Sequence, residues 1–95
     1  MEIGDFRMNE ERKRFEMKVE GQTAIIDYSL KGDVVSLTHT KVPENLEGQG
    51  VGNAIVSKTL AYIKSHGYKV APLCSFVEAY ISRHKEWDPI VTNGY

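Results

Sequence analysis

Three closely spaced glycines, Gly48, Gly50 and Gly52, stand where a strand-like pattern gives way to a helix-like one. The strand-like segment 34–42 is rich in β-branched residues and ends at Pro43, which has no amide hydrogen and stops a strand. Glycine in such a turn adopts positive φ and lets the backbone approach a ligand closely. The first amides of a helix have no intrahelical partner and attract anions. The spacing therefore predicts a phosphate-binding turn.

These glycines match neither of two common nucleotide-binding patterns. No Lys-Ser or Lys-Thr pair follows them, as a P-loop would require. If Gly48 and Gly50 fill the first two glycine positions of a dinucleotide fingerprint, Asn53 occupies the third. The alternative interpretation is that the loop is only a structural turn.

The single cysteine, Cys74, lies between a short predicted strand and a predicted helix that begins near Ser75. A thiol at a helix N-terminus is close to free amides and to the positive end of the dipole, which lower its pKa and favour the nucleophilic thiolate. Cys74 is therefore a candidate nucleophile. The alternative is a buried core thiol, because cysteine is among the most buried residue types.

Histidines and aromatic residues supply weaker candidates. His39, near the end of the strand before the glycine loop, could orient or deprotonate a thiol across the sheet, or simply be half-exposed. His39, His66 and His84 have no mutual spacing suited to a metal, and one cysteine cannot complete a zinc site, so we expect no metal. For Tyr80 and Trp87, packing in the core is favoured over contact with a ligand.

Apolar residues with a period of two predict a meander of antiparallel strands, and apolar residues at helical spacing after the glycines predict an amphipathic helix. A strand reached through that helix should lie parallel to an earlier one, which gives a mixed sheet and an α+β fold. The predicted order is strands 14–19, 23–30 and 34–42, helix 51–66, strand 68–73 and helix 76–84.

The ends of these elements are less regular. Ser75 is expected to cap the second helix, with Glu78 at its third position completing a capping box. Residues 1–11 are polar and are expected to be loose before they join the fold. The tail 90–95 receives no assignment.

Composition indicates one domain, residues 1–95, and excludes several functions. Twelve basic and 13 acidic residues give a net charge of −1, so nothing favours binding to nucleic acid. The basic run 12–14 is interleaved with acids and is typical of a solvated strand edge. No apolar run approaches the ~20 residues of a membrane span, and the N-terminus does not resemble a signal peptide. A single cysteine allows no intrachain disulfide, so we expect a cytoplasmic protein. We further expect a monomer or weak dimer.

The segment Val42-Pro43 with Gly48-Gln49-Gly50-Val51-Gly52 resembles the coenzyme A pyrophosphate loop of the GNAT superfamily of N-acetyltransferases. The segments His39-Thr40-x-Val42-Pro43 and Cys74-Ser75-Phe76-Val77, followed by Tyr80 and Trp87, resemble the small branch that keeps only the cofactor-binding half of the fold. Glu47 stands where the family usually has Arg or Gln. An acid beside a pyrophosphate is unfavourable unless it points away.

The resemblance implies a minimal GNAT-like fold that binds acetyl-CoA or coenzyme A, with the pyrophosphate on the amides of residues 49–53. The pantetheine arm would lie in a gap between strands 34–42 and 68–73. The small branch is thought to use a cysteine at this place, which implies Cys74 as an acetyl relay. The implied cofactor-binding residues are His39, Thr40, Val42, Gln49, Gly50, Val51, Gly52, Asn53 and Cys74.

Full-length members often use a glutamate to deprotonate the acceptor amine, and this sequence has no clear equivalent. Glu44 and Glu47 belong to the loop, and Glu78 is expected to be a cap. Two main functions remain: an acetyl-CoA-dependent transferase acting on an amine of a small molecule or protein, and a sensor or adaptor that binds coenzyme A without turnover. A weaker third possibility is an interaction module.

Overall fold

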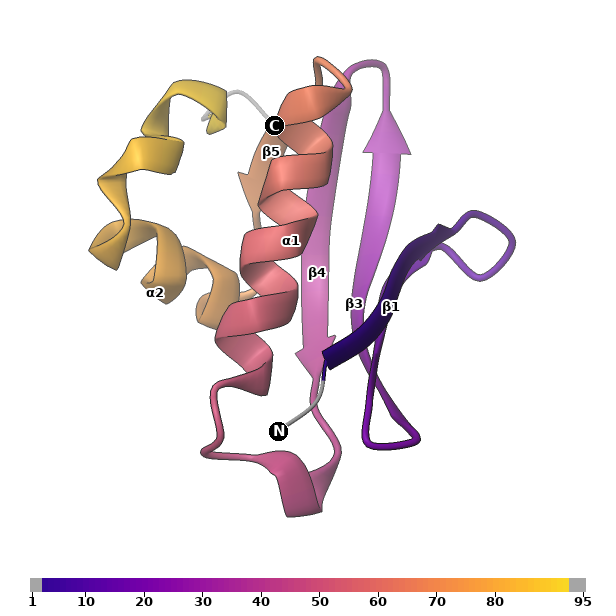
Figure 1. The fold of residues 1–95 in the computed structure, drawn as a ribbon. Coiled ribbons are helices and arrows are strands. Elements are labelled where there is room, and N and C mark those ends of the chain that lie inside the picture. Colours follow the sequence, from indigo (N-terminus) through magenta and orange to yellow (C-terminus); the bar gives the residue numbers. More distant parts are fainter. Residues whose placement is uncertain (1–2, 93–95) are drawn as a thin grey trace.

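The computed structural model describes residues 3–92, and the predictions made for residues 1–2 and 93–95 lie outside this range. A five-stranded sheet forms the body of the molecule, and the long helix runs across it (Figure 1). The elements are β1 (Ile3–Asn9), β2 (Arg14–Val19), β3 (Gln22–Lys31), β4 (Val34–Lys41), the 3₁₀ turn η1 (Glu44–Leu46), α1 (Val51–Ser65), β5 (Lys69–Pro72), α2 (Ser75–Arg83) and the 3₁₀ segment η2 (Lys85–Ile90).

The strands lie in the sheet in sequence order, from β1 to β5. Strands β1 to β4 pair antiparallel, and the tight turns that precede β3 and β4 contain Gly21 and Gly32 at φ 78° and 62°. Strand β5 is reached through α1 and lies parallel to β4, because a crossover helix returns the chain to the same end of the sheet. The predicted α+β fold with a mixed sheet is confirmed.

Strand β1 shows that the prediction of a loose N-terminal segment was wrong over the described part of it. Residues Ile3–Asn9 pair with β2 along the outer edge of the meander. Phe6 and Met8 alternate along β1 and pack against the core, and the ring of Phe6 stacks on that of Phe15 with centroids 5.9 Å apart. A few apolar residues interspersed with charged ones give a weak strand signal, and β1 forms because β2 offers it a free edge.

Helix α1 packs one face on the sheet, and the apolar face predicted for it is the one observed. Its buried residues are Val51, Gly52, Ile55, Val56, Thr59, Leu60 and Ile63, and Tyr62 is half-buried. Phe15 lies beneath the helix, with the rings of Tyr28 and Tyr62 at 5.1 and 5.4 Å. Apolar burial of this kind stabilises by about 25 cal/mol per Å² and fixes the start of α1 against the end of β4.

Helix α2 lies beside the β5 edge and contacts α1, β4 and β5 (Figure 1). Its N-cap is Cys74 and no side chain makes a capping hydrogen bond, so the predicted capping box of Ser75 and Glu78 was wrong. The amide of Cys74 donates to the carbonyl of Leu37 at 2.9 Å, and its carbonyl accepts from the amide of Glu78 at 3.0 Å. Cys74 thus bonds to β4 just after β5 and is the N-cap of α2. The helix begins at Ser75, one residue earlier than predicted.

The segment after α2 returns to the sheet. Val91 forms an isolated parallel bridge with Val70, whose carbonyl accepts from the amide of Thr92 at 3.0 Å. Tyr80 is buried and Trp87 is half-buried against the core, so both pack as expected. The indole nitrogen of Trp87 is buried and has no hydrogen-bond partner among the described residues.

The outer face of β1 and β2, turned away from the core, carries a cluster of charges. Glu16 accepts from Arg14 at 2.6 Å, from Arg7 at 3.0 Å and from Asn9 at 3.3 Å. Hydrogen bonding to Arg14, followed by that to Arg7 and Asn9, outweighs burial and lowers the pKa of Glu16 to about 2. Arg12 stays exposed in the turn, as expected of the basic run.

We expect Glu16→Gln to destabilise the fold at pH 7 by about 1 to 2 kcal/mol, less than the full pKa shift implies because Arg7 is exposed and screened. The folded-state pKa is depressed from 4.5 to about 2, so the stabilisation is complete above pH 4.5 and is lost as the pH falls toward 2. Urea unfolding from pH 7 to 2 measures it, with Glu11→Gln as the exposed control. A constant difference between Glu16→Gln and wild type across this range would contradict the prediction.

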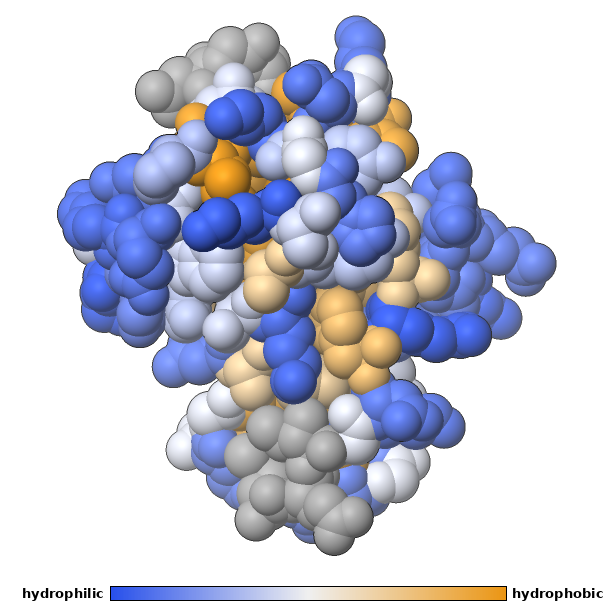
Figure 2. Space-filling view, turned by 45° about the horizontal axis from the view of Figure 1, so that its top comes forward, coloured by the Kyte–Doolittle hydropathy of each residue, from blue (hydrophilic) through white to orange (hydrophobic). Residues whose placement is uncertain are grey.

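Polar side chains dominate the surface seen in Figure 2, and apolar side chains reach it in a strip near the middle of the view. The large apolar side chains that are exposed among the described residues are Leu30, Leu73 and Phe76. Within residues 3–92 no helix is long and apolar enough to cross a membrane.

Candidate functional site

The glycine loop joins the end of β4 to α1 by way of η1. Gly48 and Gly50 have φ of 81° and 82°, a conformation that other residues rarely adopt. A Cβ added at either would meet no atom within 4 Å, so both border open space. Gly50 is the N-cap of α1, and no side chain caps this end of the helix. The amides of the first turn are therefore left for a ligand or water.

The first turn of α1 has a free approach on one side and an aromatic ring on the other. No acidic residue lies in this turn, so no side chain of the turn itself opposes an anion. Gly52 lies directly under the side chain of Phe76 from α2: a Cβ at Gly52 would come within 2.6 Å of the tip of that ring. The absence of a side chain at Gly52 thus lets α2 approach the start of α1.

A β-bulge near the end of β4 decides which side chains face this loop. Tyr28 of β3 pairs with Leu37, but Asp27 pairs with His39, so Thr38 is an extra residue in β4. Because side chains alternate along a strand, one added residue exchanges the faces beyond it. His39 consequently lies exposed, while Thr40 and then Val42 turn toward α1 and α2.

Strand β4 also runs beyond its pairing with β5. The parallel ladder ends at the pair Leu37 and Pro72, and Thr38–Lys41 of β4 have no β5 partner. The predicted gap between the two strands is present in this second half of β4. Helix α2 begins beside it.

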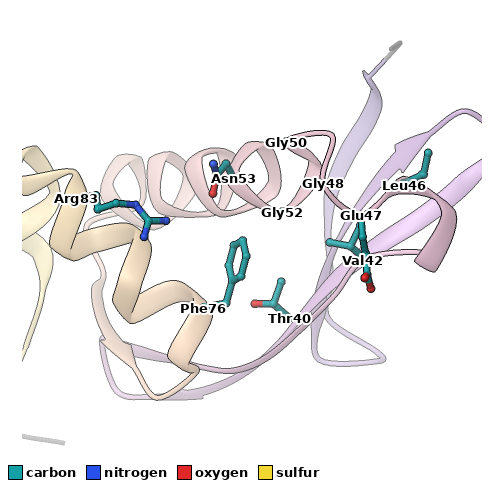
Figure 3. A pocket seen from close by; sticks show the side chains of 10 residues that line it. All are labelled: Thr40, Val42, Leu46, Glu47, Gly48, Gly50, Gly52, Asn53, Phe76 and Arg83. Carbon is teal, nitrogen blue, oxygen red and sulfur yellow. The ribbon is translucent and has the colours of Figure 1, made fainter.

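These elements enclose a cleft of about 560 Å³ between the end of β4, the loop, the start of α1 and the side of α2 (Figure 3). Cavities that bind small molecules commonly have about 300 to 1,000 Å³. Its walls combine apolar side chains, glycine backbone and a few polar groups. The lining residues are Thr40, Val42, Leu46, Glu47, Gly48, Gly50, Gly52, Asn53, Phe76 and Arg83.

Cys74 is partly buried and adjoins this cleft through its contact with Thr40, one of the lining residues. Its Sγ is 3.4 Å from the Thr40 hydroxyl oxygen. Burial raises the pKa of the thiol, while hydrogen bonding from Thr40 and from the amides of Val77 and Phe76 lowers it. The net effect is a pKa below the ordinary value, because the Thr40 hydroxyl and the first-turn amides of α2 together outweigh burial. The thiolate is therefore more available than in a free cysteine.

We expect the alkylation of Cys74 by iodoacetamide to reach half its maximal rate at a lower pH in the folded protein than in urea, where the midpoint should approach ~8.5. Thr40→Val should raise the folded midpoint because it removes the hydroxyl beside Sγ. The chain has one cysteine, so the reaction reports on this thiol alone. Thr23→Val, on the exposed face of β3, is the control. Equal midpoints in folded and unfolded protein would contradict this electrostatic account.

A family model described as GCN5-related N-acetyl-transferase matches residues 14–90, which include the loop, Cys74 and the whole cleft. The chain belongs to this family. The solution structure of a GCN5-like candidate N-acetyltransferase from Staphylococcus aureus is similar, with a TM-score of 0.70 and 21% identity. The match covers 93% of this chain and 87% of that one. No curated protein sequence matches the chain.

In this GCN5-related fold the predicted site residues divide into two groups. Five of them line the cleft: Thr40, Val42, Gly50, Gly52 and Asn53. Val51 is buried in the core, and Cys74 contacts Thr40. Gln49 lies outside, with its amide nitrogen 3.2 Å from the carbonyl of Asn45. His39 does not line the cleft but lies in a neighbouring hollow with Lys41 and Glu44, which shares Thr40, Val42 and Glu47 with the cleft. The structure does not bring His39 to Cys74.

Phe76 and Arg83 of the GCN5-related domain line the cleft without having been predicted as site residues. Both belong to α2, and only the position of that helix brings them to the loop. Their spacing of seven places them on one face of the helix, a signal that could have been used once α2 was known to flank the loop. Within the described residues no group of His, Cys, Asp or Glu could hold a metal.

Proposed function

We propose that the protein is an acetyl-CoA-dependent N-acetyltransferase whose acceptor is an amine of a small molecule or of another protein. The observation that carries this proposal is a cleft bordered by uncapped helix amides and by Thr40, whose hydroxyl contacts a thiol of lowered pKa. Membership of the GCN5-related family supports the reaction type and acetyl-CoA as the donor.

The residues around the cleft suit coenzyme A. The amides of Val51, Gly52 and Asn53, at the uncapped start of α1, can hold the pyrophosphate. Along Thr38–Lys41, the backbone groups of β4 on the side away from β3 have no β5 partner and can hydrogen-bond to the amides of the pantetheine arm. The flexible arm would then place its sulfur toward Cys74, where β5 ends.

The proposed chemistry uses Cys74 in two steps. Its thiolate attacks the thioester carbonyl of the donor, so that one C–S bond forms at Cys74 and the bond to the sulfur of coenzyme A breaks. The acceptor amine then attacks the acetyl carbonyl, a C–N bond forms, the thiolate of Cys74 leaves, and the amine loses a proton to solvent. The first step exchanges one thioester for another, so it depends on positioning more than on driving force.

One observation favours the second candidate function, binding of coenzyme A or acyl-CoA without turnover. Among the described residues, the polar side chain in contact with Cys74 is the neutral Thr40, and neither a histidine nor a carboxylate contacts the thiol. A sensor or adaptor needs the cleft and no base.

Calorimetry with coenzyme A and acetyl-CoA, followed by mass spectrometry of the intact protein, tests the proposal. We expect both ligands to bind and acetyl-CoA to add one acetyl mass. If neither ligand binds, both candidate functions are wrong. If both bind but neither acetylation of the protein nor transfer to an amine occurs, the binding function replaces the enzyme.

A further inference from the structure

Two charged residues, Glu47 and Arg83, line the cleft. Glu47 comes from the loop and Arg83 from the last turn of α2. In Figure 3 the guanidinium of Arg83 extends from α2 toward α1, into the space that Asn53 and Phe76 border. The glycines lie beyond Asn53 in this view, so Arg83 faces a different part of the cleft from the loop amides.

The guanidinium of Arg83 is exposed and forms no ion pair or side-chain hydrogen bond within residues 3–92. In contrast, Arg7 and Arg14 are both bound to Glu16 on the outer face of the sheet. An arginine in the last turn of a helix also interacts favourably with the helix dipole, which would be a purely structural role. The test must separate this role from ligand binding.

We propose that Arg83 binds the 3′-phosphate of coenzyme A and makes the site prefer the 3′-phosphorylated donor. This inference rests on the proposed function. Coenzyme A carries a second phosphate group besides the pyrophosphate, and Arg83 lines a part of the same cleft away from the loop amides. A phosphate monoester carries about −1.5 to −2 charges at pH 7, and the planar guanidinium can donate two parallel hydrogen bonds to it.

The charge balance of the cleft gives this role a physical reason. Glu47 adds a negative charge to a site that must hold a polyanion, and it occupies the loop position where a cation or amide would help. Arg83 returns the net formal charge of the lining residues to zero. The positive charge that offsets Glu47 is thus supplied by Arg83 of α2, a residue far along the chain from the loop.

The test measures dissociation constants for coenzyme A and for dephospho-CoA, which lacks only the 3′-phosphate, in wild type and Arg83→Gln. Wild type should bind coenzyme A about tenfold more tightly than dephospho-CoA. Arg83→Gln should lose this preference by weakening coenzyme A alone. Lys85→Gln, which removes an exposed cation two residues away and outside the cleft, should keep it.

Several outcomes overturn the inference while leaving the proposed function intact. An unchanged preference in Arg83→Gln, with or without a lower melting temperature, assigns Arg83 a structural role. Equal weakening of both ligands places Arg83 on the pyrophosphate instead. Failure of wild type to bind either ligand overturns the proposed function itself, and this inference with it.

Discussion

Replacing Cys74 with alanine is expected to lower acetyl transfer by at least about 100-fold, because the acetyl group then has no nucleophile to carry it to the amine. Wild-type protein incubated with acetyl-CoA should gain one acetyl mass on Cys74, and Cys74→Ser should gain none at that position. The side chain of Cys74 is half-buried rather than at the centre of the core, so we expect the fold and the affinity for coenzyme A to persist. Transfer is measured against a panel of small amines and lysine-containing peptides.

Measuring acetyl transfer in His39→Ala as well tests whether His39 activates the thiol of Cys74. His39 lies exposed in the hollow beside the cleft, and retained activity in His39→Ala would exclude it as the base that activates Cys74. Loss of activity in both variants would show that the exposed histidine reaches the thiol in the complex with substrate. Full activity in a folded Cys74→Ala that still binds coenzyme A would exclude the relay. Direct transfer from acetyl-CoA to the amine would then be the mechanism.

Most of the fold could be predicted because the strongest patterns in the sequence involve residues close together in the chain. Alternating charged and apolar residues in 14–19 require a half-buried strand, and the apolar face of 51–66 requires a sheet beneath it. Strand β1 was missed because its pairing depends on the free edge of β2, which no local pattern records. The start of α2 was misplaced by one residue because the hydrogen bond from Cys74 to Leu37, a tertiary contact, decides where β5 ends.

The sequence predicted the backbone conformation of the site more completely than it predicted which side chains line the cleft. Proline and glycine determine local φ directly, so the loop around Gly50 could be inferred from residue types alone. The extra residue at Thr38 could not, because a bulge changes the pairing with β3 without changing the β-branched composition. In a regular strand, His39 would lie on the same face as Leu37. Because of the bulge, Thr40 lies on that face instead, and its hydroxyl contacts Cys74.

Gly50→Val is expected to weaken the binding of coenzyme A about tenfold or more while leaving the fold largely intact. Gly50 has φ 82° and borders open space, so an added side chain would project where the ligand must approach the amides of α1. The same change strains the backbone by about 1 to 2 kcal/mol, because a β-branched residue is unfavourable in the left-handed region. Calorimetry and thermal unfolding measure the two effects separately.

Gly67→Val separates loss of the site from loss of stability. Gly67 follows the other end of α1, has φ 74° and also borders open space, so the substitution imposes a similar strain far from the cleft. Both variants should lower the melting temperature by comparable amounts, and only Gly50→Val should weaken the binding of coenzyme A. Unchanged affinity in Gly50→Val would remove the glycine loop from the ligand site. Equal loss of affinity in both variants would mean that backbone strain in α1, rather than the side chain at Gly50, weakens binding. The two glycines lie at opposite ends of that helix, and Gly67 is far from the cleft.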